Sequence, residues 1–204
     1  MVDPVTPESS ESGPSASPED PNSASPSHPR LLKQGTAGHV LETSSSWDGT
    51  GAPILILAWG NDLRQDDGAG PALARKMGRL APTDLASTIC AHQLTPELAL
   101  EIAQPGVETV LFVDCRVVQP GESDPVLAMH PLAPDPADPK LGHHVDARML
   151  LLYANALYDK QVCAWSITVP GWAFDHGEEF SPQTQSLLDN ADDFIAQVFQ
   201  RLLA

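Results

Sequence analysis

The sequence is poor in basic residues, in cysteine and in long apolar runs. Its 204 residues include 11 Lys and Arg against 27 Asp and Glu, which gives a formal net charge of -16. A field of that sign repels phosphate backbones and anionic lipid, so we expect neither nucleic acid nor a membrane surface as a partner. No apolar run approaches the roughly 18 residues that a membrane-spanning helix needs.

Only three cysteines are present, Cys90, Cys115 and Cys163, widely spaced and set inside apolar stretches. This pattern fits neither a disulfide framework nor a zinc cluster, so we predict three core residues in a reducing cytoplasm. The N-terminus has neither the charged region nor the apolar region of a secretory signal peptide, and it is too acidic for an organelle transit peptide. We therefore expect a cytoplasmic protein, and we expect a monomer.

Residues 1–52 have almost no aromatic or branched apolar side chains and are dominated by Pro, Ser, Gly, Glu and Asp. Such a composition cannot repay the entropy lost on ordering, so we predict a disordered tail. A binding or regulatory role for this tail is the alternative. Residues 53–204 are long enough for one compact domain with a sizeable core.

From residue 53 onward, strand patterns alternate with helix patterns. The residues Ile54 to Trp59 form a continuous apolar run, typical of a strand buried on both faces of a parallel sheet. Further strands are predicted at 87–92, 107–114, 126–130 and 162–169, and helices after Gly70, at 96–103, around Met149 to Leu157 and after Ser181-Pro182. This order predicts a three-layer α/β/α sandwich with a mostly parallel, five-stranded twisted sheet.

Acidic and imidazole side chains follow the predicted strands. Asp66 and Asp67 come after the first strand, Asp114 ends the third, and His143-His144 precede a helix. Ligands of open α/β sheets bind beyond the carboxyl ends of the strands, where these loops can converge. Carboxylates with an imidazole suit a divalent metal, but a general acid/base pair and plain structural capping remain open.

Each of these side chains also has a purely structural interpretation. Asp67 alone could cap a helix that opens at Gly68, and Asp114 could cap a turn at the end of its strand. The histidines could be surface residues of a loop. Asp62 and Asp66 are interpreted as loop or cap residues rather than ligands. The combination at successive strand ends is what favours a functional site.

Five ordered motifs resemble the hydrogenase maturation endopeptidases, which trim the C-terminal extension from the large-subunit precursor of nickel-iron hydrogenases. The first is GNDLRQDDGAG at 60–70, directly after the apolar strand. The others are HQLTPEL at 92–98, LFVD at 111–114, GHH at 142–144, and VPG at 169–171 with HGE at 176–178 before Ser181-Pro182. Together they cover nearly all of the chain from residue 54 to its end.

The resemblance implies a peptidase whose metal ligands are Asp67, Asp114 and His143. His143 is preferred to His144 because it keeps the family's offset to the apolar pair at 150–151. The resemblance also implies that the metal is nickel already inserted in the precursor, so that cleavage waits for a completed cofactor. Asn61, His92 and Gln93 are the candidate substrate contacts.

Two other functions remain open on the sequence alone. A magnesium-dependent phosphohydrolase could use Asp66, Asp67 and Asp114 to hold a hard cation, although no Lys-Ser/Thr pair follows Gly68-Ala69-Gly70. A non-catalytic module could hold the precursor without cutting it. The sequence contains neither a His-Glu-x-x-His helix nor a Gly-x-Ser-x-Gly elbow.

Overall fold

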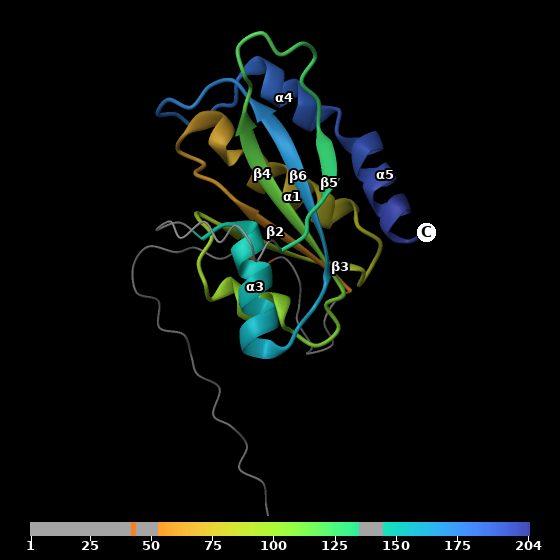
Figure 1. Cartoon of the computed structure of the whole chain (residues 1–204). Helices are drawn as coiled ribbons and strands as arrows, with labels where there is room; N and C mark the ends of the chain where they lie inside the picture. The colour runs from red at the N-terminus through yellow and green to blue at the C-terminus, as the bar shows by residue number, and fades with distance from the viewer. Residues whose placement is uncertain (1–41, 44–52, 135–144) are drawn as a thin grey trace, which may run out of the picture. The chain divides into compact units, whose positions relative to one another are not determined.

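The computed structural model describes residues 42–43, 53–134 and 145–204, which all belong to one compact unit, Thr36–Ala204. Within these residues six strands form one sheet in the order β1-β3-β2-β4-β6-β5, with the inner four parallel and the two edge strands antiparallel (Figure 1). The strands are β1 Glu42–Thr43, β2 Ile54–Trp59, β3 Ala86–Ala91, β4 Thr109–Val117, β5 Ala128–Pro131 and β6 Cys163–Gly171.

The mostly parallel α/β class is therefore confirmed, and all five predicted strands are present. The two-residue strand β1 was not predicted. It lies in the segment assigned to the tail, because two residues beside an existing edge need no apolar pattern of their own. The domain boundary between residues 52 and 53 otherwise stays a prediction.

Helices cover both faces of the sheet. They are the 3₁₀ turn η1 Gln65–Gly68, then α1 Ala69–Leu80, α2 Leu98–Ile102, α3 Ala147–Tyr158, α4 Pro182–Asp189 and α5 Asp192–Leu202. Side chains of α1, α4 and α5 share one apolar cluster with the sheet, and those of α2 and α3 share another on the opposite face. Among the helices described, none is both long and apolar enough to cross a membrane.

Strand β2 explains the unbroken apolar run. Ile54, Ile56 and Ala58 point into the cluster with α1, whereas Leu55 and Leu57 point into the cluster with α2 and α3. Because side chains alternate along a strand, a strand covered on both faces needs apolar residues at every position.

The last helical segment corrects a prediction. One helix was expected after Ser181-Pro182, but the chain forms α4 and α5. The break is an i→i−3 hydrogen bond from the Ala191 amide to the Leu188 carbonyl. Ala191 and Ile195 still pack in the same cluster as Leu188, so the apolar stripe continues through the break and hides it.

The cysteine prediction is also corrected in part. All three cysteines are free; Cys90 is buried and Cys115 is partly buried, but Cys163 is exposed. Cys163 is the first residue of β6, and burial along this strand increases toward its other end.

The order of the inner strands places a ligand-binding edge between β2 and β4. From β2 the chain runs through α1 on one face to β3, then through α2 on the other face to β4, on the far side of β2. The strand order thus reverses between β2 and β4, whose carboxyl ends flank the crevice where open α/β sheets bind ligands.

Candidate active site

The loop after β2 presents Asp67. Its Oδ2 accepts a hydrogen bond of 2.9 Å from the Asn61 amide, and its own amide donates to the Arg64 carbonyl at 3.1 Å. The Asn61 side chain turns back to accept from the Leu63 amide at 2.9 Å. The Asp67 side chain is half-buried, and within the described residues its Oδ1 has no hydrogen-bond donor.

Helix capping does not account for Asp67. The N-cap of α1 is Gly68, and no side chain caps this helix. Asp67 lies inside η1, which also has no side-chain cap. One Asp67 oxygen therefore shapes the loop, and the other accepts no hydrogen bond from the residues that the structure describes.

Asp114 lies on the neighbouring strand. The predicted strand ended at this residue, but β4 continues to Val117, so Asp114 sits within the strand rather than at a turn. Ala58 of β2 pairs with Val113, which puts Asp114 level with Trp59 at the end of β2. Asp114 comes two positions after the buried Phe112, so its side chain faces the side of the sheet that α2 and α3 cover.

The Asp114 carboxyl group is electrostatically linked to Asp67. Burial raises the pKa of Asp114 to about 7, and the negative charge of Asp67 adds to this rise, while a hydrogen bond from the Cys115 amide opposes it. That bond is 2.8 Å long and occupies Oδ1. The neighbouring Cys115 thiol is affected by the same carboxylates. Its pKa is raised to about 12, first by burial and then by the negative charges of Asp114, Asp66 and Asp67.

Asp66 is fully buried, and both of its carboxylate oxygens accept hydrogen bonds. Its Oδ2 accepts from the Trp172 amide at 2.7 Å, the Ala173 amide at 3.0 Å and the Ser181 hydroxyl at 2.7 Å. Its Oδ1 accepts from the Ser181 amide at 2.7 Å. Burial favours the neutral acid, but these hydrogen bonds outweigh it and lower the pKa of Asp66.

Ser181 has two roles, of which the sequence shows one. Its hydroxyl accepts from the Thr184 amide at 3.3 Å and caps α4, as predicted. The same hydroxyl donates a hydrogen bond to Asp66, which no local sequence pattern predicts. The interpretation of Asp66 as a residue that fixes the loop is thereby confirmed, with its partner now known.

Two loops are joined beside the site. The Gln65 amide donates to the Gly177 carbonyl at 2.8 Å, and the Gly177 amide donates to the Leu63 carbonyl at 2.9 Å. The Gln65 side chain accepts from the Asp175 amide at 3.1 Å. Gln65 holds φ at 49°, an uncommon value for a residue other than glycine, which these bonds stabilise.

The other predicted site residues differ in their placement. Asn61 joins Asp67 directly. His92 and Gln93 follow β3 at the same edge of the sheet, both exposed, and no hydrogen bond joins either to Asp67 or Asp114. His143 and His144 lie outside the described residues. Within the part of the chain that the structure describes, no three His, Cys, Asp or Glu side chains gather closely enough to hold a metal ion.

The fold is shared with two solved proteases. One is the [NiFe] hydrogenase maturation protease HycI from Thermococcus kodakarensis KOD1, with a TM-score of 0.53 and 20% identity over 73% of this chain and 93% of that one. The other is the hydrogenase 2 maturation peptidase from Thaumarchaeota archaeon SCGC_AB-539-E09, with a TM-score of 0.50 and 18% identity over 72% and 97%. No protein-family model and no curated protein matches the chain. The expected fold is thus confirmed, and the chemistry must be argued from the site.

Proposed function

We propose that this chain is an endopeptidase that removes the C-terminal extension of a nickel-iron hydrogenase large-subunit precursor after nickel insertion. The observation that supports it most is that Asp67 and Asp114 lie close enough at the crevice between β2 and β4 for the negative charge of Asp67 to add to the raised pKa of Asp114. The two solved structures compared above carry the names of a hydrogenase maturation protease and a hydrogenase maturation peptidase.

Asp67, Asp114 and His143 are the proposed ligands of the precursor's nickel. Each described carboxylate keeps one oxygen that accepts no hydrogen bond from the described residues, which suits a metal shared with a bound substrate. Carboxylate and imidazole donors suit nickel as well as harder ions. When present beside the scissile bond, the metal supplies Lewis-acid polarisation of the carbonyl. A carboxylate at this position can hold or deprotonate the attacking water.

The precursor is expected to lie along the exposed edge of the sheet. His92 and Gln93 follow β3 there, and the Gly60 amide donates to the Ala91 carbonyl at 3.2 Å, which ties the two strand ends together. Asn61 orients Asp67 through its backbone amide. These three residues are the proposed substrate contacts, and we propose a monomer acting in the cytoplasm.

The alternative of a magnesium-dependent phosphohydrolase loses one of its three carboxylates. Asp66 is fully buried and already accepts four hydrogen bonds, so it has no oxygen to offer a cation. Only two of the three carboxylates remain available for a cation, and no phosphate-binding Lys-Ser/Thr pair follows Gly68-Ala69-Gly70.

A cleavage assay tests the proposal. The host's large-subunit precursor, with and without nickel, is incubated with the full chain or with Asp67→Asn, and intact mass reports the product. Loss of a C-terminal peptide only from the nickel-loaded precursor, and only with the parent protein, is expected. An unchanged mass with a stable complex between the two proteins would replace the protease with a precursor-holding module.

A further inference from the structure

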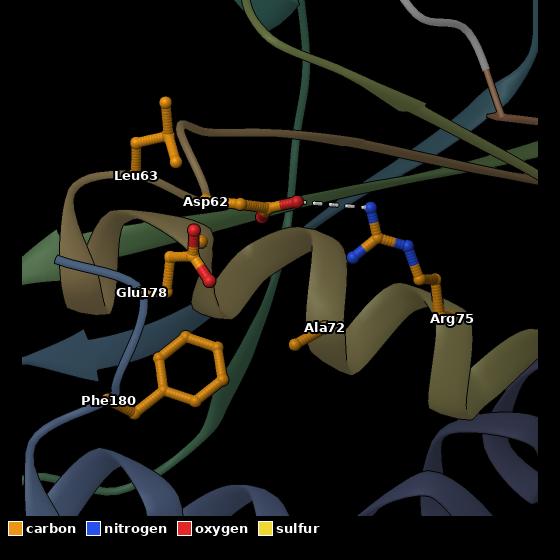
Figure 2. A pocket seen from close by; sticks show the side chains of 7 residues that line it. Asp62, Leu63, Ala72, Arg75, Glu178 and Phe180 are labelled. Atoms are coloured by element: carbon orange, nitrogen blue, oxygen red, sulfur yellow. Dashed lines mark hydrogen bonds and ion pairs between the residues drawn. The ribbon is translucent and has the colours of Figure 1, made fainter.

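A pocket of about 380 Å³ opens beside the candidate active site, on the face of the sheet that α1 covers. Two stretches of the chain that are far apart in the sequence line it: residues 62–75, which run from the loop after β2 into α1, and residues 178–180, just before α4 (Figure 2). Its charged side chains are Asp62, Arg75 and Glu178. Four of its lining residues lie in the motifs at 60–70 and 176–178, but the sequence alone does not show that these two motifs meet.

The charges of the pocket leave a negative excess. Arg75 lies 3.4 Å from Asp62, so these two opposite charges offset each other, as the dashed line in Figure 2 shows. Among the described residues Glu178 has neither an ion-pair nor a hydrogen-bond partner. An anionic guest would meet two carboxylates against one engaged guanidinium, whereas a cation would find Glu178 open.

The rest of the lining is apolar. Phe180 and Ala72 face the pocket from opposite sides in Figure 2, and Leu63 contributes to the rim with half of its surface exposed. A guest with an apolar stem and a cationic head satisfies both parts of this lining. Lysine and arginine side chains have that shape, since they bury their methylene stems and keep the charge at the tip. The Phe180 ring can also attract a cation that lies over its face.

The pocket adjoins the residues that hold Asp67. Gly68 lines the pocket and directly follows Asp67, while Asp62 lines it and directly follows Asn61, the residue that donates to Asp67. An ideal Cβ on Gly68 would lie 2.8 Å from Asp62 Oδ1, so these two loop positions are packed against each other. The pocket therefore lies directly beside the loop that positions Asp67.

We propose that the pocket receives a lysine or arginine side chain of the polypeptide on which Asp67 and Asp114 act, with Glu178 as the charged partner. This inference rests on the proposed peptidase function for the identity of the polypeptide. It adds a specificity determinant outside the metal ligands.

Binding is tested first, without any precursor. The full chain, labelled with ¹⁵N, is titrated with Nα-acetyl-arginine amide, Nα-acetyl-lysine amide and the neutral isostere Nα-acetyl-citrulline amide. We expect saturable shifts at Leu63, Gly68, Ala72 and Phe180 with the two cations, at dissociation constants on the order of millimolar. Citrulline should bind about threefold to fivefold more weakly, the size of one partly exposed ion pair.

Two matched variants test whether the Glu178 carboxylate is the partner of the bound cation. Glu178→Gln should weaken arginine binding about threefold to fivefold, whereas Glu179→Gln, at the next and also exposed position, should leave it unchanged. Equal binding of arginine and citrulline, or equal effects of the two variants, would overturn the inference. So would tighter binding of Nα-acetyl-glutamate amide.

Processing then separates the inference from the proposed function. With the nickel-loaded precursor, Glu178→Gln should raise KM about threefold to fivefold at unchanged kcat, and Glu179→Gln should raise neither. If the protein bound arginine selectively but did not cleave the precursor, the proposed peptidase function would be rejected and the proposal of a cation-binding pocket would stand. If Glu178→Gln cleaved the precursor with an unchanged KM, the proposed role of the pocket in substrate binding would be rejected and the peptidase function would stand.

Discussion

Asp66 and Ser181, 115 positions apart in the chain, are joined by two hydrogen bonds of 2.7 Å, one from the Ser181 amide and one from its hydroxyl. This pair connects the loop that presents Asp67 to the start of α4. We predict that Asp66→Asn lowers the free energy of unfolding by about 3 kcal/mol, because an amide group must face buried donors. Urea denaturation measures this, with Asp84→Asn, at an exposed position, as the control.

The same pair sets a dependence on pH. The hydrogen bonds lower the folded-state pKa of Asp66 below its ordinary value of 3.8. Its contribution to stability is therefore fully present above that value and is lost as the pH falls through the lower folded-state pKa. The difference in unfolding free energy between Asp66→Asn and the parent should shrink on acidification. A constant difference down to strongly acidic pH would contradict this account.

The contribution of Asp114 to stability should depend on pH in the opposite direction. Its folded-state pKa is raised from 3.8 to about 7. Between these values the folded state binds more protons than the unfolded state, so stability falls as the pH rises through this window. Asp114→Asn should therefore stabilise the metal-free protein by about 2 kcal/mol near pH 8, a value discounted for partial exposure, and by almost nothing near pH 4.

Thermal unfolding at both pH values, in the presence of a chelator, measures the Asp114 effect. Asp175→Asn, on an exposed loop, serves as the control. A destabilised Asp114→Asn at the higher pH would mean that the ionised carboxylate is favourably held in the free protein. The predicted gain would instead mark Asp114 as a group kept for its chemistry at a cost in stability.

Gly60 should be intolerant of any side chain. An ideal Cβ at Gly60 would lie 2.0 Å from the Asp67 carbonyl oxygen, and its φ of 151° already disfavours L-residues. We predict that Gly60→Ala costs about 3 kcal/mol, because the backbone of the Asp67 loop must move. Gly121→Ala is the matched variant, since Gly121 has a φ of 85° but an ideal Cβ there would meet no atom within 4 Å.

The Gly121 variant isolates the cost of the backbone conformation, about 1 kcal/mol. Denaturation midpoints of both variants are compared with the parent protein. A Gly60→Ala variant no less stable than Gly121→Ala would show that the Asp67 loop yields easily, and that Asp67 is not held in a fixed position.

The sequence was most informative where both faces of an element are buried. The apolar run of β2 gave the strand its correct bounds, Ile54–Trp59, because nothing but a doubly covered strand explains it in that length. The break between α4 and α5 could not be predicted, since Leu188 and Ile195 pack on the same surface. The strand β1 depends on pairing with β3 rather than on any periodicity of its own.

The site was predictable in part for a similar reason. Asp67 lies in the segment that follows β2, and Asp114 lies in the second half of the neighbouring strand β4. The carboxyl ends of neighbouring parallel strands meet at one edge of a sheet, so the order of elements brings these two side chains to the same edge. The partner of Asp66 and the pocket around Glu178 are made by contacts across more than a hundred residues. Such contacts leave no local signal, because each side chain also suits an ordinary loop.

The proposed metal ligands provide the most direct prediction about the reaction. Asp67→Asn keeps an oxygen for the Asn61 amide but removes the negative charge that the proposed nickel site requires, so the fold should persist and processing should stop. His143→Ala should have the same effect and His144→Ala should not. Each loss should exceed the roughly 10–100-fold effect of removing an outer partner of a metal site. Circular dichroism verifies the fold, and intact mass of the nickel-loaded precursor measures processing. Full activity of His143→Ala with loss in His144→Ala would transfer the ligand to the neighbouring histidine, because the two positions differ by a single step along the segment that precedes α3.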